Sequence, residues 1–583
     1  MRKVNLLIIS SSLLLVACGG GEKATTAPVV PPVVPPPVEN SQNLIKLNQL
    51  GFVTGSAKIA VVPASTATSF RLVSVSEGSE VYSGQLATPS NWAPADESVS
   101  IADFSDFSVA GQYRLEVEGF SPSSPFEIND EVFAAVHDAA LKAYYFNRAS
   151  TELLPEHAGQ FARAAGHPDT QVKIHSSAAS ESRPAGSIIS APKGWYDAGD
   201  YGKYVVNSGI STYSLLIAYE QYPQFYAQRE LNIPESDDAV PDILDEIKWN
   251  LDWLQAMQDP ADGGVYHKLT TLNFAGMVMP EEATAQRYVV QKGTAAALDF
   301  AAVMAVASRI YAEFDSQFPG LSQQYRDAAI NAWNWAQQHS NVAYQQPDDV
   351  STGGYGDQQF DDEFAWAAAE LYLLTNETQY LDKFKQLDVT LSVPGWPNTS
   401  ALGYFSLLAN GKELLSEADY QSFSNKLTAL ADSIVVQYQQ SAYQVAMQNN
   451  DFVWGSNSVA LNKAMVLLQA QHLTEQQDYR NAALGLLDYV LGRNPTDYSY
   501  VTGFGTKTPM HIHHRPSEAD GIVEPVPGFI AGGAQNGQQD DCVYPSDLPA
   551  KSYLDDVCSY STNEIAINWN APLVYVLAGL QTQ

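Results

Sequence analysis

The chain has few cysteines and few positive charges, and each shortage narrows the classes of protein that it fits. Only three of its 583 residues are cysteine, and no set of cysteine and histidine residues has the spacing of a zinc site. We therefore expect no zinc. Basic side chains number 31 against 65 acidic ones, so the formal net charge is -34. Such a surface repels phosphate backbones, which excludes nucleic acid as an expected partner and fits a neutral substrate.

Beyond the first residues no stretch has the pattern expected of a transmembrane span, and the apolar stretch at the start has the form of a targeting signal. Residues 1–17 start with Arg2 and Lys3 and continue as an apolar segment too short for a stable membrane span. The segment ends just before Cys18, which is typical of a bacterial lipoprotein signal. We expect Cys18 to carry lipid, so that the exported protein is anchored to a bacterial membrane, at the cell surface or in the periplasm.

The remaining cysteines and the residues after Cys18 describe an exported chain. Residues 18–42 are rich in proline, which predicts a stiff polyproline II spacer. Cys542 and Cys558 would meet oxidising conditions, which allow a disulfide, but the sequence leaves their pairing open.

Two periodicities divide the rest of the chain. Residues 43–129 contain short runs rich in β-branched and aromatic residues, separated by Gly, Pro, Ser and Asn, which predicts a small all-β sandwich. Residues 130–583 change to a helical period, as in TAAALDFAAVMAVASRIYAEF. No strand pattern alternates with these helices, which excludes an α/β barrel. The sequence predicts a large all-α domain whose long loops carry the chemistry.

The segment GWYDAGDYGKYV holds two aspartates three residues apart, Asp197 and Asp200, around Gly199. A tight turn there aims both carboxylates at one point, where they can hold and polarise a water. A loop that caps a helix or binds calcium fits the same spacing, so this pattern leaves two interpretations open.

A second acidic segment, YLDDVCSYSTNEIAINWNAP, places Glu564 just before an apolar helix. A carboxyl in partly dehydrated surroundings can stay protonated and serve as an acid. Compensation of charge at a helix N-terminus is the alternative, because glutamate is common there.

Three histidines cluster in PMHIHHRP, at His511, His513 and His514. They could hold a metal, bind a phosphate or bond to sugar hydroxyls. Three histidines so close on an extended loop do not easily face one metal, and no carboxylate is adjacent, so we favour sugar hydroxyls.

Together these segments resemble glycoside hydrolase family 9, the inverting cellulases. GWYDAGDYGKYV is similar to the family's base segment, YSYVTGFGTKTPMHIHHRP to its histidine segment and YLDDVCSYSTNEIAINWNAP to its acid segment, while NQLGF resembles the start of its N-terminal immunoglobulin-like module. The resemblance runs from about residue 44 to the end. It implies an (α/α)6 barrel behind an immunoglobulin-like sandwich, with the site in a cleft at one end of the barrel.

The resemblance also implies roles for individual residues. Asp200 corresponds to the general base, Asp197 to its partner on the same water and Glu564 to the general acid. Asp555 corresponds to a further site carboxylate. The remaining expected contacts to substrate are His513, Arg515, Trp454, Trp569 and Tyr196.

Members of this family often bind structural calcium, and the loop TGGYGDQQFDDEFAW resembles that region. The expected hard oxygen ligands are Asp357, Asp361, Asp362 and Glu363.

The resulting hypothesis is a monomeric endo-1,4-β-glucanase that acts on cellulose-type β-1,4-glucan or cello-oligosaccharides by single displacement. Two rivals stay open: an exo-acting cellodextrinase, β-glucosidase or glucosaminidase, and a surface lipoprotein that binds glycan without catalysis. Carboxyls at Asp197, Asp200 and Glu564 argue against the second rival.

Overall fold

The computed structural model describes residues 44–582. The expected signal peptide, the proline-rich spacer and the lipid site at Cys18 lie outside the described residues. The described residues form a β-sandwich and a helical domain.

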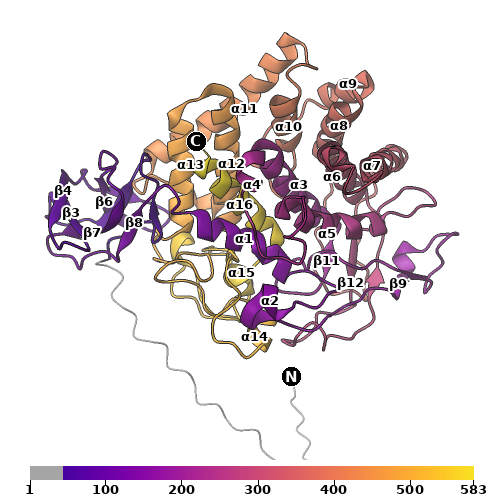
Figure 1. Cartoon of the computed structure of the whole chain (residues 1–583), viewed down its shortest axis with the longest axis horizontal. Helices are drawn as coiled ribbons and strands as arrows, with labels where there is room; N and C mark the ends of the chain where they lie inside the picture. The colour runs from indigo at the N-terminus through magenta and orange to yellow at the C-terminus, as the bar shows by residue number, and fades with distance from the viewer. Residues whose placement is uncertain (1–43, 583) are drawn as a thin grey trace, which may run out of the picture. The chain divides into compact units, whose positions relative to one another are not determined.

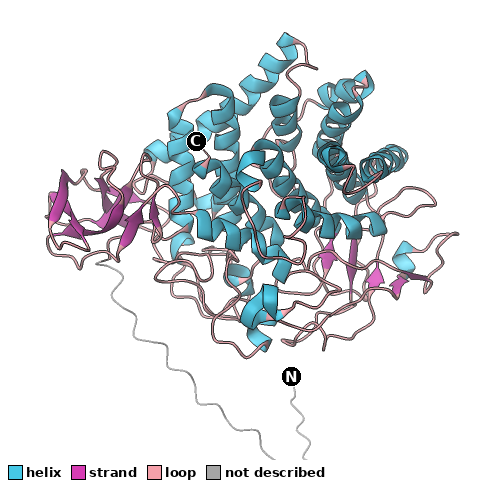
Figure 2. Ribbon diagram, viewed as in Figure 1, coloured by secondary structure: helices cyan, strands magenta, loops and turns pink. Residues whose placement is uncertain are grey.

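The N-terminal part is a sandwich of two sheets (Figures 1 and 2). Its strands are β1 (Gly51–Phe52), β2 (Ile59–Pro63), β3 (Ser69–Ser74), β4 (Glu80–Gln85), β5 (Ser90–Trp92), β6 (Glu97–Asp103), β7 (Gly111–Val117) and β8 (Phe126–Ile128). One sheet has the order β1-β8-β7-β3-β4 and the other β2-β6-β5. Along β7, the alternate residues Tyr113, Leu115 and Val117 are buried, because successive side chains of a strand point to opposite faces. The predicted immunoglobulin-like sandwich is confirmed.

Twelve described helices of nine or more residues form two rings of six. The inner ring is α3 (Val205–Gln221), α6 (Thr294–Tyr311), α8 (Asp361–Thr375), α10 (Leu402–Asn410), α12 (Ser456–Thr474) and α16 (Ile567–Gln581). The outer ring is α1 (Ala134–Phe146), α5 (Asp242–Met257), α7 (Leu321–Gln338), α9 (Thr378–Leu387), α11 (Glu417–Gln440) and α13 (Gln477–Val490). Each outer helix packs on an inner one, and α16 packs on α3, so the predicted (α/α)6 barrel is confirmed.

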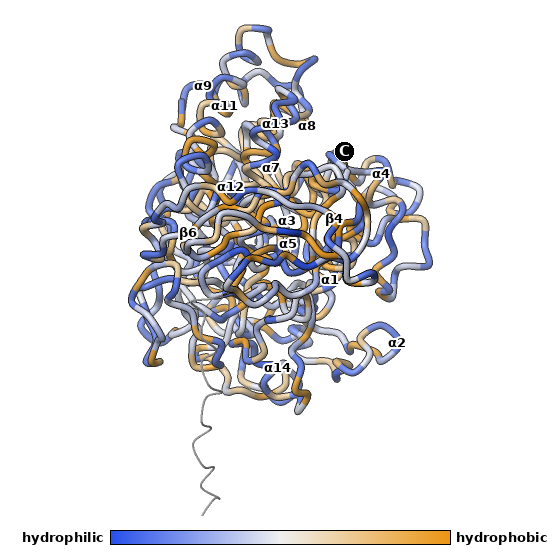
Figure 3. Tube along the Cα trace, turned by 90° about the vertical axis from the view of Figure 1, so that its left-hand side faces the viewer, coloured by the Kyte–Doolittle hydropathy of each residue, from blue (hydrophilic) through white to orange (hydrophobic). Residues whose placement is uncertain are grey.

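The two rings follow from different sequence patterns. In α6 almost every residue is apolar or small, so the helix is buried on all sides. The segment Thr294–Phe314 is long and apolar enough to span a membrane, but 89% of it is buried inside the protein, as the inner wall of a barrel requires. In α7, by contrast, Tyr325, Ala329, Ala332 and Ala336 are buried on one face at helical spacing, while the other face is polar. Figure 3 shows hydrophobic residues concentrated toward the middle of the molecule and hydrophilic ones at many points along its edge.

The loops at one end of the barrel carry a small sheet that the sequence did not predict. Its strands are β9 (Val172–Ile174), β10 (Ile188–Ile189), β11 (Lys203–Tyr204), β12 (Lys268–Thr270) and β13 (Tyr288–Val289), in the order β10-β9-β13-β12-β11. Strands of two or three residues are too short to show a period of two in the sequence. Short helices complete the loops: α2 (Pro155–Ala158), α4 (Pro223–Tyr226), α14 (Arg515–Ala519), α15 (Tyr560–Asn563), and the 3-10 turns η2 (Gly159–Phe161), η3 (Ser176–Ala178), η4 (Ala312–Phe314), η5 (Asn449–Asp451) and η6 (Pro549–Lys551).

The NQLGF segment joins the sandwich to the barrel. The side-chain amide of Asn48 donates to Asp488 of α13 at 2.9 Å, and the amide of Gln49 donates to the carbonyl of Asp497 at 2.8 Å. Just before them, the buried Lys46 ammonium donates to the Tyr443 hydroxyl at 3.1 Å. This segment, which the sequence indicated as the start of the β domain, is thus also its attachment to the helical domain.

Candidate active site

Three loop segments that are far apart in sequence meet in one narrow strip. Ala198 pairs with Ala566, and His513 pairs with Glu564, in isolated β-bridges. The backbone N–H of Ile567 donates to the carbonyl of Asp197 at 2.8 Å, which fastens the acid segment to the base segment. The three motifs that the sequence indicated are therefore parts of one site.

Gly199 makes this close approach feasible. A Cβ at this position would lie 2.1 Å from the carbonyl oxygen of His513, so only glycine fits between the two segments. The N–H of Gly199 donates to the Glu564 carboxyl at 3.3 Å, and the Arg515 guanidinium donates to the Gly199 carbonyl at 2.6 Å. The backbone of Gly199 thus bonds to a residue of each of the two other segments and holds all three together.

The two aspartates are held by different donors. Asp200 accepts from the N–H of Gly202 at 2.8 Å and from the Tyr204 hydroxyl at 3.1 Å, both on the same oxygen. Asp197 accepts from the Asn207 amide at 2.6 Å and from the Tyr355 hydroxyl at 2.7 Å. Burial and the nearby charge of Asp200 raise the pKa of Asp197 to about 7. Neither aspartate caps a helix: the N-cap of α3 is Tyr204, with no side-chain cap.

Glu564 lies between α15 and α16 and not in the first turn of α16, which holds no acidic residue. Charge compensation at a helix N-terminus, the alternative for this residue, is therefore wrong. Burial in the cleft wall, together with the charges of Asp200 and Asp197, raises the pKa of Glu564 well above its usual value. A carboxyl with a raised pKa keeps its proton to higher pH and can act as an acid.

These carboxyls share a cleft of about 910 Å³, at the upper end of the range for ligand sites of about 300–1,000 Å³. Of the residues expected in the site, the cleft is lined by Asp197, Asp200, Glu564, His513, Arg515, Trp454 and Trp569. Trp454 is 42% exposed, which is unusual for tryptophan and leaves a flat apolar face for a sugar ring.

His513 is held in one orientation at the cleft. Its Nδ1 bonds to the carbonyl of Val557 at 2.6 Å, which requires a proton on that nitrogen and leaves Nε2 as the other polar edge. Burial lowers the pKa of His513. The neighbouring His514 is buried, with its pKa lowered to about 3, and bonds to the Ser517 hydroxyl at 2.9 Å. The three histidines therefore do not face one point.

Two expected site residues lie elsewhere. Tyr196 is 2% exposed, does not line the cleft, and its hydroxyl bonds to His167 at 2.8 Å. The expectation that Tyr196 contacts substrate is wrong, because its neighbours Asp197 and Asp200 turn to the cleft while its own ring packs into the core beside Tyr201. Asp555 also does not line the cleft: it accepts from the backbone N–H groups of Met510 and His511, which positions the histidine segment.

Several cleft residues were not predicted. They are mostly aromatic: Tyr204, Tyr560 and Asn568 lie inside the base and acid segments, whereas Phe274, Tyr355, Trp396 and Gln539 lie outside them. The Tyr355 hydroxyl donates a hydrogen bond to Asp197, and the Tyr355 ring packs edge-on against Trp396 with 5.2 Å between ring centres. In the sequence, Tyr355 is marked by nothing except its position in the glycine-rich loop that resembles a calcium-binding region.

That loop and α6 form a second acidic cluster. Both oxygens of Glu363, Oδ1 of Asp299 and Oδ2 of Asp357 are buried without a hydrogen-bond partner. Burial and mutual repulsion raise the pKa values of Asp299 and Glu363 well above their usual values. Unpartnered buried carboxylate oxygens require a cation or a proton, so these residues fit a hard cation such as Ca²⁺.

The acidic cluster differs from the expected calcium ligand set in two respects. Asp299 of α6, 58 or more residues before the expected ligands, belongs to the cluster although nothing in an apolar helix marked it in the sequence. Asp361 is exposed at the start of α8, and its charge is not among those that raise the pKa of Glu363. In the described residues 44–582, no three His, Cys, Asp or Glu side chains are placed so that together they could hold a metal ion, so the calcium site stays a prediction.

Cys542 and Cys558 are joined in a disulfide that closes a 16-residue separation. Within this loop the Tyr544 hydroxyl bonds to Asp540 at 2.7 Å, and from the segment before it Gln539 reaches the cleft. No residue between the two cysteines lines the cleft, but the Val557 carbonyl within the loop holds His513, which does.

A cleft in which a glutamic acid of raised pKa lies near a pair of aspartates, lined by exposed aromatic rings, defines a glycoside hydrolase that works by acid–base catalysis. The chain belongs to glycosyl hydrolase family 9: the family's model matches residues 133–577, and that of the cellulase N-terminal ig-like domain matches residues 40–121.

Known relatives resemble the chain over most of its length. It is 44% identical over 550 residues to the xyloglucan-specific endo-beta-1,4-glucanase BoGH9A of Bacteroides ovatus, covering 92% of this chain and 93% of that one. It is 34% identical over 542 residues to endoglucanase D of Acetivibrio thermocellus, covering 92% and 83%. The solved structure of a Bacteroides ovatus GH9 protein matches with a TM-score of 0.88 and 42% identity, covering 93% of this chain and 99% of that one. The predicted family and enzyme class are confirmed.

Proposed function

We propose that the protein hydrolyses β-1,4-glucosidic bonds within glucan chains by single displacement. The observation that carries the proposal is Glu564, whose pKa is raised in the same cleft that Asp197 and Asp200 line. One carboxyl that keeps its proton and another that accepts one are what acid–base cleavage of a glycosidic bond needs.

The reaction proceeds in one step in this scheme. Asp200 takes a proton from a water, the water oxygen bonds to C1 of the sugar, and the C1–O bond to the next sugar breaks. Glu564 gives its proton to the departing oxygen. Asp197 holds the same water, and Tyr355 and Asn207 hold Asp197. Solvent then returns the proton from Asp200 to Glu564.

The stereochemistry of the product tests this scheme. Water that enters opposite the leaving group converts a β-linked chain to an α-anomer. Proton NMR in the first minutes of cello-oligosaccharide hydrolysis, before mutarotation, should show the α-anomer at the new end. An initial β-anomer would indicate a covalent intermediate, and the role of Asp200 would be wrong.

We propose an endo mode of attack. The large cleft and its several aromatic rings suit a chain that extends beyond one or two sugars, and two of the named relatives above are endoglucanases. The Cys542–Cys558 loop holds His513 of the cleft through the Val557 carbonyl and is the feature that would favour exo attack. Viscosity of a soluble β-1,4-glucan, plotted against reducing ends, distinguishes the modes: a rapid early fall supports endo attack, while release of glucose or cellobiose at constant viscosity supports the exo rival.

For the substrate, we propose soluble β-1,4-glucans, including xylose-substituted ones. The support is the similarity to a relative whose name specifies xyloglucan and the volume of the cleft. Rates on amorphous cellulose, cello-oligosaccharides and xyloglucan, measured side by side, test this assignment.

We further propose a structural Ca²⁺ held by Asp299, Asp357, Asp362 and Glu363. The support is the set of buried carboxylate oxygens without partners on Asp299, Asp357 and Glu363. Asp362, whose charge helps to raise the pKa of Glu363, adds a fourth carboxylate nearby. The ion would neutralise these charges and tie the Tyr355 loop to α6 and α8, without taking part in the chemistry. We still expect that the protein binds no zinc.

Finally, we propose that lipid on Cys18 anchors a monomeric enzyme to a bacterial membrane, as the sequence of residues 1–18 suggests. Replacing Cys18 by Ser should move the enzyme from the membrane fraction to the soluble one. Unchanged fractionation would remove the lipid from the proposal.

A further inference from the structure

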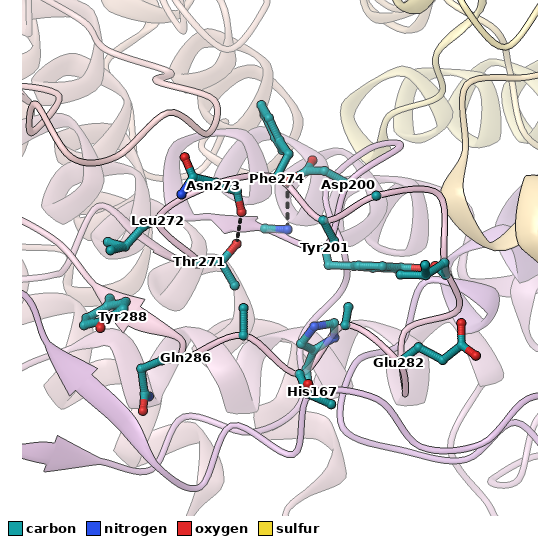
Figure 4. A pocket seen from close by; sticks show the side chains of 17 residues that line it. His167, Asp200, Tyr201, Thr271, Leu272, Asn273, Phe274, Glu282, Gln286 and Tyr288 are labelled. Atoms are coloured by element: carbon teal, nitrogen blue, oxygen red, sulfur yellow. Dashed lines mark hydrogen bonds between the residues drawn. The ribbon is translucent and has the colours of Figure 1, made fainter. Parts of the chain in front are cut away.

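A second hollow of about 630 Å³ adjoins the catalytic cleft. It is formed by the segment from Thr271 to Tyr288 on one side and by His167 and residues 200–202 on the other. Asp200 and Phe274 line both the hollow and the cleft, so the two spaces meet beside Asp200, the proposed general base. Figure 4 shows Asn273 and Phe274 on one side of the opening and Gln286 and His167 on the other.

The lining of this hollow suits a neutral sugar. The groups left for sugar hydroxyls are the Thr284 hydroxyl, the Asn273 amide nitrogen and the Gln286 side-chain oxygen. The Gln286 amide nitrogen already donates to the carbonyls of Gln171 and Arg287, and the Thr271 hydroxyl donates to the carbonyl of Asn273. Phe274, which is 47% exposed at the junction, presents an apolar ring on which a sugar can stack.

The same lining disfavours a charged glycan. No lysine or arginine lines the hollow, and its one histidine, His167, has its pKa lowered to about 3 by burial and by nearby Arg287, so the ring is neutral. The two acidic residues that line it, Asp200 and Glu282, would repel an acidic sugar.

The segment that forms the hollow is held in place from four sides. The Tyr201 hydroxyl donates to the carbonyl of Val278 at 2.6 Å, and the Arg515 guanidinium donates to the carbonyl of Ala275 at 3.0 Å. The N–H of Ser351 donates to the carbonyl of Leu272 at 2.8 Å. Arg287 donates to the carbonyl of Tyr201 at 2.6 Å. A preformed hollow of this kind binds a ligand without the entropy cost of ordering a loop.

The hollow lies beside the path of the main chain. The scissile bond must lie between the base and Glu564, and only the cleft is lined by both. The hollow contacts this path at Asp200 and Phe274, the two residues that it shares with the cleft. We infer that it accepts a neutral sugar branch carried by a β-1,4-glucan next to the bond that is cut. This inference rests on the proposed hydrolysis of β-1,4-glucan.

Blocking the hollow separates this inference from the proposed function. Ala285 and Thr284 are exposed lining residues, so Ala285→Trp and Thr284→Trp each fill the hollow without changing the cleft. Ala179→Trp, at an exposed alanine that lines neither space, is the matched control. Melting curves establish that each variant folds, and two independent blocking positions guard against the failure of one.

The probes are xyloglucan, whose branches are neutral xylosyl units, and unbranched cellohexaose. Both blocking variants should lose about tenfold or more in kcat/KM on xyloglucan and keep wild-type values on cellohexaose, while Ala179→Trp changes neither. Equal losses on both substrates, or unchanged rates on both, would overturn the inference. Wild-type enzyme that cuts cellohexaose but not xyloglucan would also overturn it and leave the proposed function standing. Wild-type enzyme that cuts neither refutes the proposed function itself.

Binding provides a second readout that does not need turnover. In a Glu564→Gln background, calorimetry should show a xyloglucan oligosaccharide binding more tightly than cellotetraose, and Ala285→Trp should remove the difference. Equal affinities before blocking would contradict the inference.

Discussion

The protein holds two buried acidic clusters that differ in their surroundings. Asp197 in the catalytic cluster accepts hydrogen bonds on both oxygens, and the cluster opens to a cleft. Glu363 in the second cluster is fully buried, and neither of its oxygens has a partner. Burial and like charge raise pKa values in both.

A raised pKa alone therefore does not identify a catalytic carboxyl in this protein. What distinguishes the catalytic cluster is access to a substrate-sized space together with donors that orient each carboxyl. What distinguishes the second cluster is oxygen atoms left for a cation. The same substitution of Glu by Gln should have opposite consequences in the two places.

Glu564→Gln and Asp200→Asn should produce the largest effect. Each removes a group that transfers a proton, and such groups typically contribute about 10²–10⁴-fold to the rate. We expect turnover of soluble glucan to fall by at least that factor while the melting temperature changes little. Glu363→Gln is the matched control and should keep most of the initial rate. Normal activity in either of the first two variants would end the assignment.

Removing calcium should act on stability instead. A ligand at about 100 times its Kd stabilises the folded state by about 2.7 kcal/mol, so chelator should lower the melting temperature more than the initial rate. Glu363→Gln should lose this response. Unchanged melting in excess chelator, with no calcium in the metal analysis, would remove the ion from the proposal.

The pH dependence of the melting temperature in chelator is a further test of the calcium proposal. Without the ion, the folded state favours protonated Glu363, whose pKa is raised above the usual 4.5. That contribution is present at pH values below the unfolded pKa and is lost as pH rises above it. In chelator, the melting temperature of the wild type should therefore fall more steeply above pH 4.5 than that of Glu363→Gln. Parallel curves would contradict the assigned role of Glu363.

The comparison also shows what the sequence alone reveals. Asp197, Asp200 and Glu564 could be predicted because each lies in a contiguous motif, and the barrel because its helices are long and periodic. Tyr355 and Asp299 could not, because their roles arise from contacts between loops and helices that are distant in sequence. Tyr196 was misassigned because a motif shows which residues are adjacent but not which face each side chain takes.

Asp197→Asn should have an intermediate effect. Asp200 keeps the water, so the loss should stay below about 100-fold. Above pH 7 an ionised Asp197 helps to raise the pKa of Glu564. Without that charge, the pKa of Glu564 falls, and the alkaline limb of kcat/KM should move to lower pH. A limb that stays in place would mean that Asp197 does not influence the acid.

The smallest expected effects distinguish Tyr196, which was wrongly predicted to contact substrate, from Trp454, which lines the cleft. Tyr196→Phe removes only the hydrogen bond to His167, which typically contributes about 1 kcal/mol to stability. It should lower the melting temperature slightly and leave KM unchanged, because the ring lies away from the cleft. Trp454→Ala removes an exposed ring that lines the cleft, so it should raise KM while stability is kept. Loss of an aromatic stack of about 0.5–1.5 kcal/mol corresponds to about 2- to 12-fold in kcat/KM. Melting curves and kinetics on cellohexaose measure both variants together. A raised KM for Tyr196→Phe would return that tyrosine to the substrate site, and an unchanged KM for Trp454→Ala would take the tryptophan out of it.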